Sequence, residues 1–441
     1  MAMPVIRNIC THLTILSLVI IAGCITVYFV MFGSVEHLKS SPKMKKGHIM
    51  MTIEVNASRS LSQSVPNQRE NNLSNTKVKQ YNVLIFGEKQ TMSQGLGFLE
   101  NDRSSGQWQY SGTCSNHKTN MRIVLGSQAK DFIDQDAIIL NMDESRVTHQ
   151  LKMLQTMTTD PGQAWIFYGR EPLIRTRWQV PGIGVLPLHG VWSYYNNSEI
   201  LMKYGYSVPG KPMMQKNVSM DFWSQGKTKL VSWMARNCWD TFWPRSAFVK
   251  ELQKHIPVDV YGACGTLECL PRLSEKCREN LRVYKFYLAL ESAECEDYTT
   301  EKLWENALMN NVVPVVHGAQ RECYRREAPP GSYIYASDFP SVKALADYLI
   351  LLNNEPDLYA KYFQWQYQGS IGQPKQIRAP LHFELFCSTI PFIDKVKEQK
   401  LLKRPFSSFP YFSSCRNLKG EDATFRPSTK TLLTQWNPGR W

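Results

Sequence analysis

The chain has 441 residues, of which 43% are hydrophobic and 20% are charged, and its formal net charge is +13. This length accommodates two domains of ordinary size and an additional segment. The basic excess does not indicate nucleic-acid binding, because the part expected to fold contains no run of Arg and Lys and no known nucleic-acid motif. The charge suits a site for an anionic diphosphate, or solubility alone.

The first feature along the chain is an uncharged apolar segment, residues 13–32. Twenty residues are the length that a helix needs to cross a bilayer, so we predict a transmembrane signal anchor behind a cytosolic tail of residues 1–12. Lysines after the segment favour a cytosolic carboxyl end by the positive-inside rule. Nine of the 11 cysteines follow the segment, as do all the Asn-x-Ser/Thr sequons, and both features suit an oxidising lumen. The sequons begin at Asn56, Asn72, Asn196 and Asn217.

Residues 33–80 contain no Phe, Tyr or Trp and are rich in Ser, Asn, Lys and Gln. Such a composition cannot bury enough apolar surface to order the chain. We therefore predict a disordered stem that separates the folded part from the membrane.

Apolar runs at residues 81–86, 137–140 and 163–168 alternate with polar, helix-capable segments. This alternation predicts a first α/β domain over residues 81–220. Residues 90–120 show no assignable pattern. Residues 181–220 are rich in Pro, Gly and aromatic residues and are interpreted as loops and a linker.

A second α/β domain is predicted over residues 221–400, followed by a tail of residues 401–441. It opens with a strand at residues 229–235, a helix at 246–255 and a strand at 257–262. A further amphipathic helix begins after Ser341, which is a suitable N-cap. The expected fold is α/β, with two Rossmann-like domains that face a cleft.

The stretch around which the second domain is organised is residues 284–318. A buried apolar run, Tyr284 to Leu290, precedes a polar elbow, Glu291 to Tyr298; a helical pattern from near Thr299 and a second apolar run, Val312 to Val316, complete a βαβ unit. Parallel units bind ligands outside the carboxyl ends of their strands. A helix start beside Lys302 would suit a phosphate or diphosphate, although a solvated turn has a similar composition.

The string KFYLALES…DYTTEK…NAL…VPVVHG in this unit resembles the donor-nucleotide motif of the alpha-1,3-fucosyltransferases, usually written with FENS, DY(V/I)TEK and VPVV. The close resemblance covers residues 230–365. It implies a GT-B architecture, a single-pass type II protein of the Golgi membrane with a lumenal catalytic part, and GDP-fucose as the donor substrate.

The resemblance also implies roles for individual residues. Lys302 and Arg245 would neutralise the donor diphosphate, while Glu301 would bind the ribose hydroxyls and Tyr298 would contact the nucleotide. The same comparison adds four residues to the predicted donor site: Glu291, Arg321, Tyr324 and Arg325.

A carboxylate in the first domain has the position of a general base. Glu171 follows Trp165 by six residues, which is the spacing between a family Trp and the Glu of an ESP motif. The resemblance then implies inverting transfer of L-fucose from GDP-fucose to a GlcNAc hydroxyl, in alpha-1,3 linkage, on a glycan of a glycoprotein or glycolipid. Glu171 would accept the hydroxyl proton.

Three departures from the family pattern keep other functions open. The Ser of ESP is absent after Glu171, Ser292 replaces the usual Asn of FENS, and WSYYNNSEILMKYG lacks the Arg of the acceptor-side pattern. A catalytically silent relative that binds nucleotide sugar or glycan is the alternative function. A basic lumenal protein that binds acidic glycans is a third hypothesis.

Four cysteines crowd into one segment, at positions Cys264, Cys269, Cys277 and Cys295. Their spacing does not match the CxxC pairs of zinc sites and no His lies between them, so we predict disulfides of undetermined pairing. The odd number of lumenal cysteines leaves at least one free or paired between chains. The donor region contains no Asp-x-Asp, so no metal is expected to hold the diphosphate, and a divalent ion is expected at most to stimulate.

Overall fold

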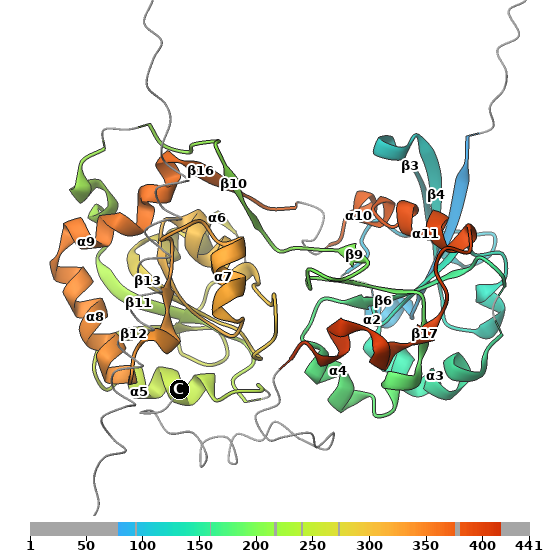
Figure 1. Ribbon diagram of the computed structural model, residues 1–441, viewed down its shortest axis with the longest axis horizontal. Helices are drawn as coiled ribbons and strands as arrows, with labels where there is room; N and C mark the ends of the chain where they lie inside the picture. Colours follow the sequence, from blue (N-terminus) through green and yellow to red (C-terminus); the bar gives the residue numbers. More distant parts are fainter. Residues whose placement is uncertain are drawn as a thin grey trace, which may run out of the picture. The chain divides into compact units, whose positions relative to one another are not determined.

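The computed structural model in Figure 1 describes residues 78–415, apart from 93–94, 159, 216–217, 240, 272–273 and 375–379. These residues belong to one compact unit, Asn75–Trp441. The predicted anchor and stem, the sequons at Asn56, Asn72 and Asn217, and residues 416–441 lie outside the described part. Within that part, no helix is both long and apolar enough to cross a membrane.

An eight-stranded sheet organises the first lobe, which we define as residues 80–205 together with 381–415. Its strand order is β2-β3-β4-β1-β5-β6-β8-β9, and neighbouring strands are parallel from β4 to β9. The strands are β1 (Gln80–Phe86), β2 (Glu100–Asn101), β3 (Trp108–Cys114), β4 (Thr119–Gly126), β5 (Ala137–Leu140), β6 (Ala164–Gly169), β8 (Gly190–Ser193) and β9 (Ile200–Leu201). The helices are α2 (Lys89–Met92), α3 (Glu144–Thr156) and α4 (Leu173–Gln179).

The three apolar runs predicted to be strands in this lobe are confirmed as β1, β5 and β6. All residues of β5 and β6 are buried, as expected of parallel strands covered on both faces. The interpretation of residues 181–220 as loops alone was wrong, because β8 lies there and pairs with β6. A four-residue strand among Pro and Gly gives no periodic pattern, and only its pairing defines it.

A five-stranded parallel sheet organises the second lobe, residues 206–372. Its order is β12-β11-β13-β14-β15, so that the strand of the donor motif is central. The strands are β11 (Lys229–Met234), β12 (Val258–Tyr261), β13 (Tyr284–Leu290), β14 (Val313–His317) and β15 (Ile334–Tyr335). The helices are α5 (Arg245–Leu252), α6 (Glu275–Arg282), α7 (Arg321–Glu327), α8 (Val342–Asn354) and α9 (Pro356–Ala360). A separate two-stranded antiparallel sheet, β10 (Tyr206–Pro209) with β16 (Gly369–Gly372), completes the lobe.

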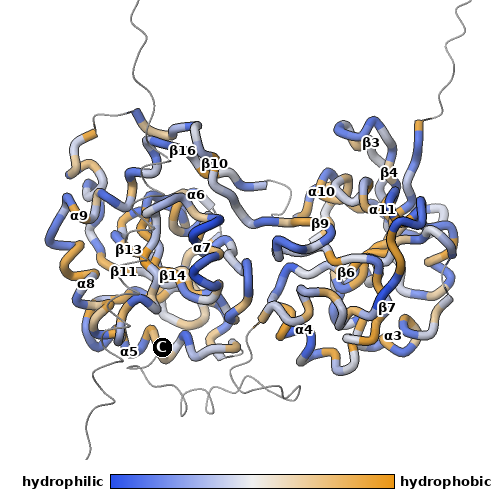
Figure 2. The backbone as a smooth tube through the Cα atoms, in the orientation of Figure 1, coloured by the Kyte–Doolittle hydropathy of each residue, from blue (hydrophilic) through white to orange (hydrophobic). Residues whose placement is uncertain are grey.

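The predicted βαβ unit is confirmed as β13, a short helix and β14. The helix is a π-helical segment, Lys302–Ala307, followed by one 3₁₀ turn, Leu308–Asn310. The N-cap prediction for α8 is also confirmed, since the Ser341 side chain accepts a hydrogen bond from the backbone N–H of Ala344 at 3.1 Å. In Figure 2, α7 is hydrophilic whereas β6 is largely hydrophobic.

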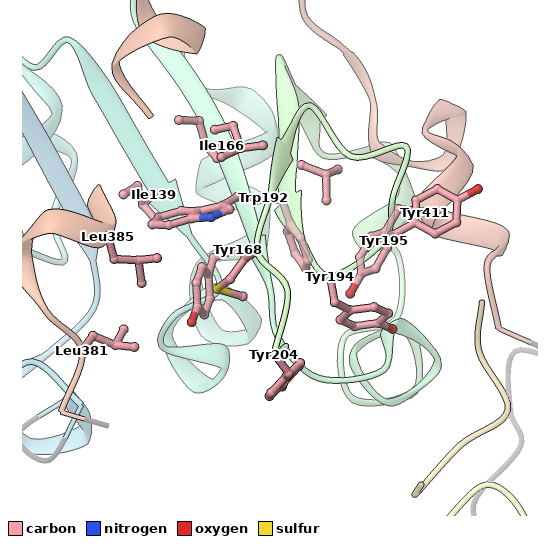
Figure 3. Packing of buried hydrophobic residues seen from close by; sticks show 14 of the residues in the cluster. Ile139, Ile166, Tyr168, Trp192, Tyr194, Tyr195, Tyr204, Leu381, Leu385 and Tyr411 are labelled. Atoms are coloured by element: carbon pink, nitrogen blue, oxygen red, sulfur yellow. The ribbon is translucent and has the colours of Figure 1, made fainter. Parts of the chain in front are cut away.

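Residues 381–415 return to the first lobe, whereas the sequence analysis divided them between the second domain and a tail. They contain α10 (Phe383–Cys387), α11 (Ile390–Lys397) and β17 (Arg404–Pro405), which pairs with β7 (Pro187–Leu188). Figure 3 shows Leu381, Leu385 and Tyr411 within the cluster that includes Ile139 and Trp192. The apolar faces of these helices match the first sheet, and this long-range packing leaves no trace in local sequence patterns.

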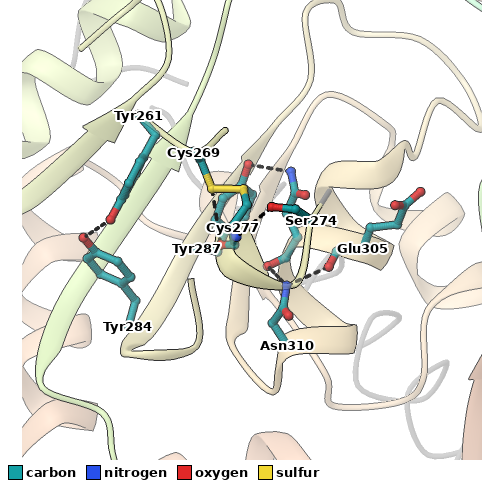
Figure 4. Close-up of a disulfide and its surroundings, with 9 residues drawn as sticks. Tyr261, Cys269, Ser274, Cys277, Tyr284, Tyr287, Glu305 and Asn310 are labelled. Atoms are coloured by element: carbon teal, nitrogen blue, oxygen red, sulfur yellow. Dashed lines mark hydrogen bonds between the residues drawn. A yellow bond between two sulfur atoms is a disulfide. The ribbon is translucent and has the colours of Figure 1, made fainter. Parts of the chain in front are cut away.

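Disulfide bonding of all four candidate cysteines is confirmed. Cys269 pairs with Cys277 inside the crowded segment (Figure 4), while Cys264 pairs with Cys238 and Cys295 with Cys415. A fourth bond joins Cys114 to Cys387 and fastens the returning segment to the first sheet. Among the described cysteines, Cys323 is free and buried.

Candidate active site

The elbow after β13 is built around the carboxylate of Glu291, which is only 1% exposed. It accepts hydrogen bonds from the Thr300 backbone N–H at 2.8 Å, from the Thr300 hydroxyl at 2.9 Å and from Lys302 Nζ at 2.9 Å. Burial raises the pKa of Glu291, while the neighbouring Lys302 lowers it. Gly318 has φ +132° and allows close approach, since a Cβ there would lie 2.5 Å from the Glu291 Cβ.

The Lys302 ammonium group is held by neighbouring side chains of the elbow. Nζ also donates to the Thr300 hydroxyl at 2.8 Å and lies 3.5 Å from Glu301 Oε1. Burial lowers the pKa of Lys302, but the negative charges of Glu291 and Glu301 raise it by a larger amount, so the net shift of this pKa is upward. The helix start that the sequence assigned to a phosphate is therefore occupied by the Glu291 carboxylate, and the Lys302 charge is already balanced.

Arg245, the first residue of α5, is 3% exposed. Its Nη1 donates to the Leu290 carbonyl at 3.0 Å and its Nη2 to the Asn237 carbonyl at 2.7 Å. Burial lowers the pKa of Arg245, and the charge of Glu291 partly offsets this effect. The side chain thus ties α5 to the carboxyl end of β13, next to the elbow.

The candidate base of the first lobe meets the elbow of the second through one hydrogen bond. The Tyr298 hydroxyl donates to Glu171 Oε2 at 3.3 Å. Tyr298 is buried, and its ring packs 4.8 Å from that of Tyr194. Burial, together with the charge of Glu171, holds the pKa of Tyr298 well above its usual value, so the phenol remains a donor. Glu171 itself is exposed, and its carbonyl accepts from the Tyr411 hydroxyl at 3.1 Å.

A cavity of about 250 Å³ lies at the carboxyl ends of β5 and β6, where Glu171 forms part of its wall. Asn141 also lines it, with φ +72° and 6% exposure. Its Nδ2 donates to the Tyr168 carbonyl at 3.1 Å, but its buried Oδ1 has no partner among the described residues. A strained residue with an unsatisfied acceptor suits a ligand that carries N–H or O–H groups.

Glu144 and Arg170 complete the polar wall of this cavity. Burial raises the pKa of Glu144; Arg175 lowers it and Glu171 raises it. Asn141, Glu144 and Arg170 were not among the site residues predicted from the sequence. Each follows the carboxyl end of a predicted parallel strand, and that rule could have flagged them.

The three residues of α7 that were predicted to belong to the donor site lie apart from this contact. Tyr324 is buried, and its hydroxyl accepts from the Ala319 N–H at 3.4 Å. Arg321 pairs with Asp338 at 2.9 Å, and Arg325 with Glu322 at 3.2 Å. Both arginines line a separate cavity of about 350 Å³, so their role at the donor stays a prediction.

Asn196 and Lys203 of the first lobe contact carboxylates of the second lobe beside Tyr298. The backbone N–H of Asn196 donates to Asp297 Oδ2 at 2.8 Å, and its side-chain Nδ2 donates to Glu327 Oε1 at 2.9 Å. Lys203 pairs with Glu327, and Arg326 with Asp297. N-glycosylation at Asn196 uses the same nitrogen, so modification would require the bond to Glu327 to break.

No cluster of three or more His, Cys, Asp or Glu side chains in the described part could hold a metal ion. A cavity of about 430 Å³ between α5 and β12 is larger than the one beside Glu171, but it shares no residue with the arrangement above.

Part of the chain is similar to known fucosyltransferases. Residues 224–405 match Glycosyltransferase family 10 (fucosyltransferase) C-term. Glycoprotein 3-alpha-L-fucosyltransferase A of Drosophila melanogaster is 46% identical over 148 residues, which are 33% of this chain and 29% of that protein. Alpha-(1,3)-fucosyltransferase 4 of Homo sapiens is 33% identical over 248 residues, 55% of this chain and 44% of that protein.

A third relative, a 3-galactosyl-N-acetylglucosaminide 4-alpha-L-fucosyltransferase of Bos taurus, is 35% identical over 241 residues, 54% of this chain and 62% of that protein. The chain thus spans between 29% and 62% of the length of these relatives. The matched range contains β11 to β15 and the whole elbow. Residues 224–405 of the chain are thus similar to the C-terminal part of glycosyltransferase family 10, a family of fucosyltransferases.

Proposed function

We propose that this protein transfers L-fucose from GDP-fucose to a GlcNAc hydroxyl of a glycan on a glycoprotein or glycolipid, in alpha-1,3 linkage and with inversion. The observation that carries the proposal is the hydrogen bond between Tyr298 and Glu171. It brings a carboxylate of the first lobe to the donor motif of the second, as a reaction between a donor and an acceptor requires. Two α/β lobes with a site between them are also the GT-B arrangement.

Glu171 is the general base of the proposed reaction. It is exposed beside a cavity that suits one sugar ring and its hydroxyls, and the neutral phenol of Tyr298 holds its carboxylate by a hydrogen bond. In the reaction, Glu171 accepts the acceptor hydroxyl proton while that oxygen forms a bond to the anomeric carbon. The bond from this carbon to the diphosphate breaks, and its electron pair leaves with GDP.

The second lobe supplies the donor site. Arg245 and Lys302 lie beside Glu291 at the carboxyl end of β13, where parallel sheets bind ligands, and both cations would contact the donor diphosphate. Glu301 and Tyr298 would contact the nucleotide. Arg321, Tyr324 and Arg325 would form the far side of the donor site.

We also propose that the protein is a single-pass type II protein of the Golgi membrane, with both lobes in the lumen. Four disulfides support an oxidising compartment. Glycosidase treatment should shorten the apparent mass of the protein. Protease access to the lobes in sealed microsomes, together with unmodified sequons, would contradict this topology.

The experiment for the activity is an acceptor panel incubated with the full chain and radiolabelled GDP-fucose. The panel includes core chitobiose and N-acetyllactosamine glycans, and linkage analysis of the product tests both the position and the inversion. Labelled product in alpha-1,3 linkage supports the proposal. GDP-fucose binding without transfer to any acceptor would instead support a silent relative.

A further inference from the structure

Arg170 is a cation that the donor motif does not include. It directly follows β6, beside Glu171, and lines the 250 Å³ cavity. Tyr204 holds it in two ways. The Tyr204 hydroxyl donates to the Arg170 carbonyl at 2.9 Å and accepts from Arg170 Nε at 3.3 Å. The guanidinium carbon also lies 5.4 Å from the centre of the Tyr204 ring, so the position of this charge is fixed.

The same segment rests against the donor motif. A Cβ atom on Gly205 would lie 2.3 Å from the ring of Trp304, which shows that the backbone beside Tyr204 contacts the helix after the elbow. Tyr204 also shares a small pocket with Asp297 and Thr299 of the elbow. Burial lowers the pKa of Arg170, but Tyr204, Tyr168 and Glu301 together raise it by a larger amount, so the net shift of this pKa is upward. Among the predicted donor residues, Glu301 thus acts on the Arg170 guanidinium through its negative charge.

Ion pairing distinguishes Arg170 from three other cations around the elbow, whereas Arg245 contacts backbone carbonyls and, like Arg170, no carboxylate among the described residues. Lys302 pairs with Glu291, Lys203 with Glu327 and Arg326 with Asp297. Arg170 forms no ion pair with any carboxylate in the described ranges, although its side chain is half-buried. A guanidinium without a carboxylate partner can pair with an anionic ligand.

We propose that Arg170 binds the diphosphate of the nucleotide-sugar donor from the first lobe. This inference rests on the proposed function. The planar guanidinium can bind two phosphate oxygens at once. As the bond between the anomeric carbon and the diphosphate breaks, the electron pair passes to the leaving oxygen, and Arg170 stabilises the charge that develops there. Adjacent residues of one strand end thus serve the leaving group and, through Glu171, the acceptor proton.

The test compares GDP with guanosine, because the two ligands differ only in the diphosphate. Calorimetry on the full chain should show that Arg170→Gln weakens GDP binding about tenfold to a hundredfold, the value of one or two charge-assisted hydrogen bonds, and leaves guanosine binding unchanged. Arg170→Lys keeps the charge and should recover part of the loss. Arg282→Gln removes the same charge from an exposed pair with Glu275 and should change neither affinity.

Other outcomes separate the alternatives. Equal losses for GDP and guanosine would show that Arg170 only maintains the shape of the site, and unchanged GDP affinity with a raised KM for the acceptor would assign it to the acceptor. Either result overturns the inference while the fucosyltransferase proposal stands. Failure of the unaltered chain to bind GDP would reject both. Tyr204→Phe should also weaken GDP more than guanosine, because it frees the guanidinium.

Discussion

The two lobes differ in how the polar and charged groups of the candidate site are paired. In the second lobe, most charged groups at the elbow are paired, as Glu291 is with Lys302 and Asp297 with Arg326, whereas Arg245 beside them contacts backbone carbonyls. In the first lobe, Arg170 has no carboxylate partner and Asn141 Oδ1 has no hydrogen-bond partner among the described residues. The comparison teaches that paired charges shape the elbow, whereas unpaired groups are available to a ligand.

Replacement of Glu171, the proposed general base in the first lobe, should change the rate of fucose transfer more than replacement of Lys302 or Glu327 would. Glu171→Gln retains size and hydrogen bonding but cannot accept a proton, so fucose transfer should fall by about a hundredfold to ten-thousandfold. GDP affinity should be unchanged, because the donor site remains intact. Initial rates on a verified acceptor and GDP titrations measure the two quantities. Near-normal turnover by Glu171→Gln would assign the proton to another acid, and Glu144 would be the next candidate.

Replacement of Lys302 tests whether its ion pair with Glu291 stabilises the second lobe. Removal of one partner of such a pair should lower the free energy of unfolding. In Lys302→Ala the Glu291 carboxylate stays buried without its cation, and the free energy of unfolding should fall by about 3–5 kcal/mol. Denaturant unfolding measures this change. Lys343→Ala removes an exposed pair with Asp347 and should cost less than about 1 kcal/mol.

Adding Glu291→Gln to Lys302→Ala should recover part of the lost stability, because the unpaired charge is removed. If Lys302→Ala unfolds like the unaltered chain but loses GDP affinity tenfold or more, Lys302 serves the ligand directly. In that case a residue with an ion-pair partner would bind the ligand, and pairing would not separate structural residues from ligand-binding residues.

Glu327 should give the smallest effect, with a pH dependence of known sign. Burial raises the pKa of Glu327, but the hydrogen bonds from Lys203, Asn196 and Arg326 lower it by a larger amount. The pKa in the folded state therefore lies below the unfolded value of about 4.3. The stabilisation is therefore present above about pH 4.3 and is lost as the pH falls through the folded pKa. Glu327→Gln should cost about 1.5–3 kcal/mol at pH 7 and show a shallower loss of stability below pH 4.3. Identical pH profiles for the two proteins would exclude this contact as a source of stability.

Much of the second lobe was readable from local sequence. The strand Tyr284–Leu290 is β13 with the predicted bounds, because a strand buried on both faces needs an unbroken apolar run. Ser341 caps α8 because a hydroxyl at that position satisfies a free backbone N–H. The elbow residues could be placed at a strand end for the same local reason.

The partners of those residues could not be predicted, because they come from distant parts of the chain. Glu291, rather than a phosphate, lies at the helix start in this structure, and the Tyr298 hydroxyl contacts Glu171 from the other lobe. Positive φ at Asn141 and the lack of an ion pair at Arg170 are equally invisible in sequence. Such features depend on which groups meet in space.

The sequence by itself determined the α/β class, the donor motif, the position of Glu171 after a buried strand and the disulfide chemistry of the crowded cysteines. Tertiary structure decided that residues 381–415 pack on the first lobe, that Cys295 pairs with Cys415, and that Arg170 stands unpaired beside the base. The physical reason is range. Burial periodicity and capping act within a few residues, whereas packing, disulfide pairing and charge balance depend on residues separated by as many as 315 positions.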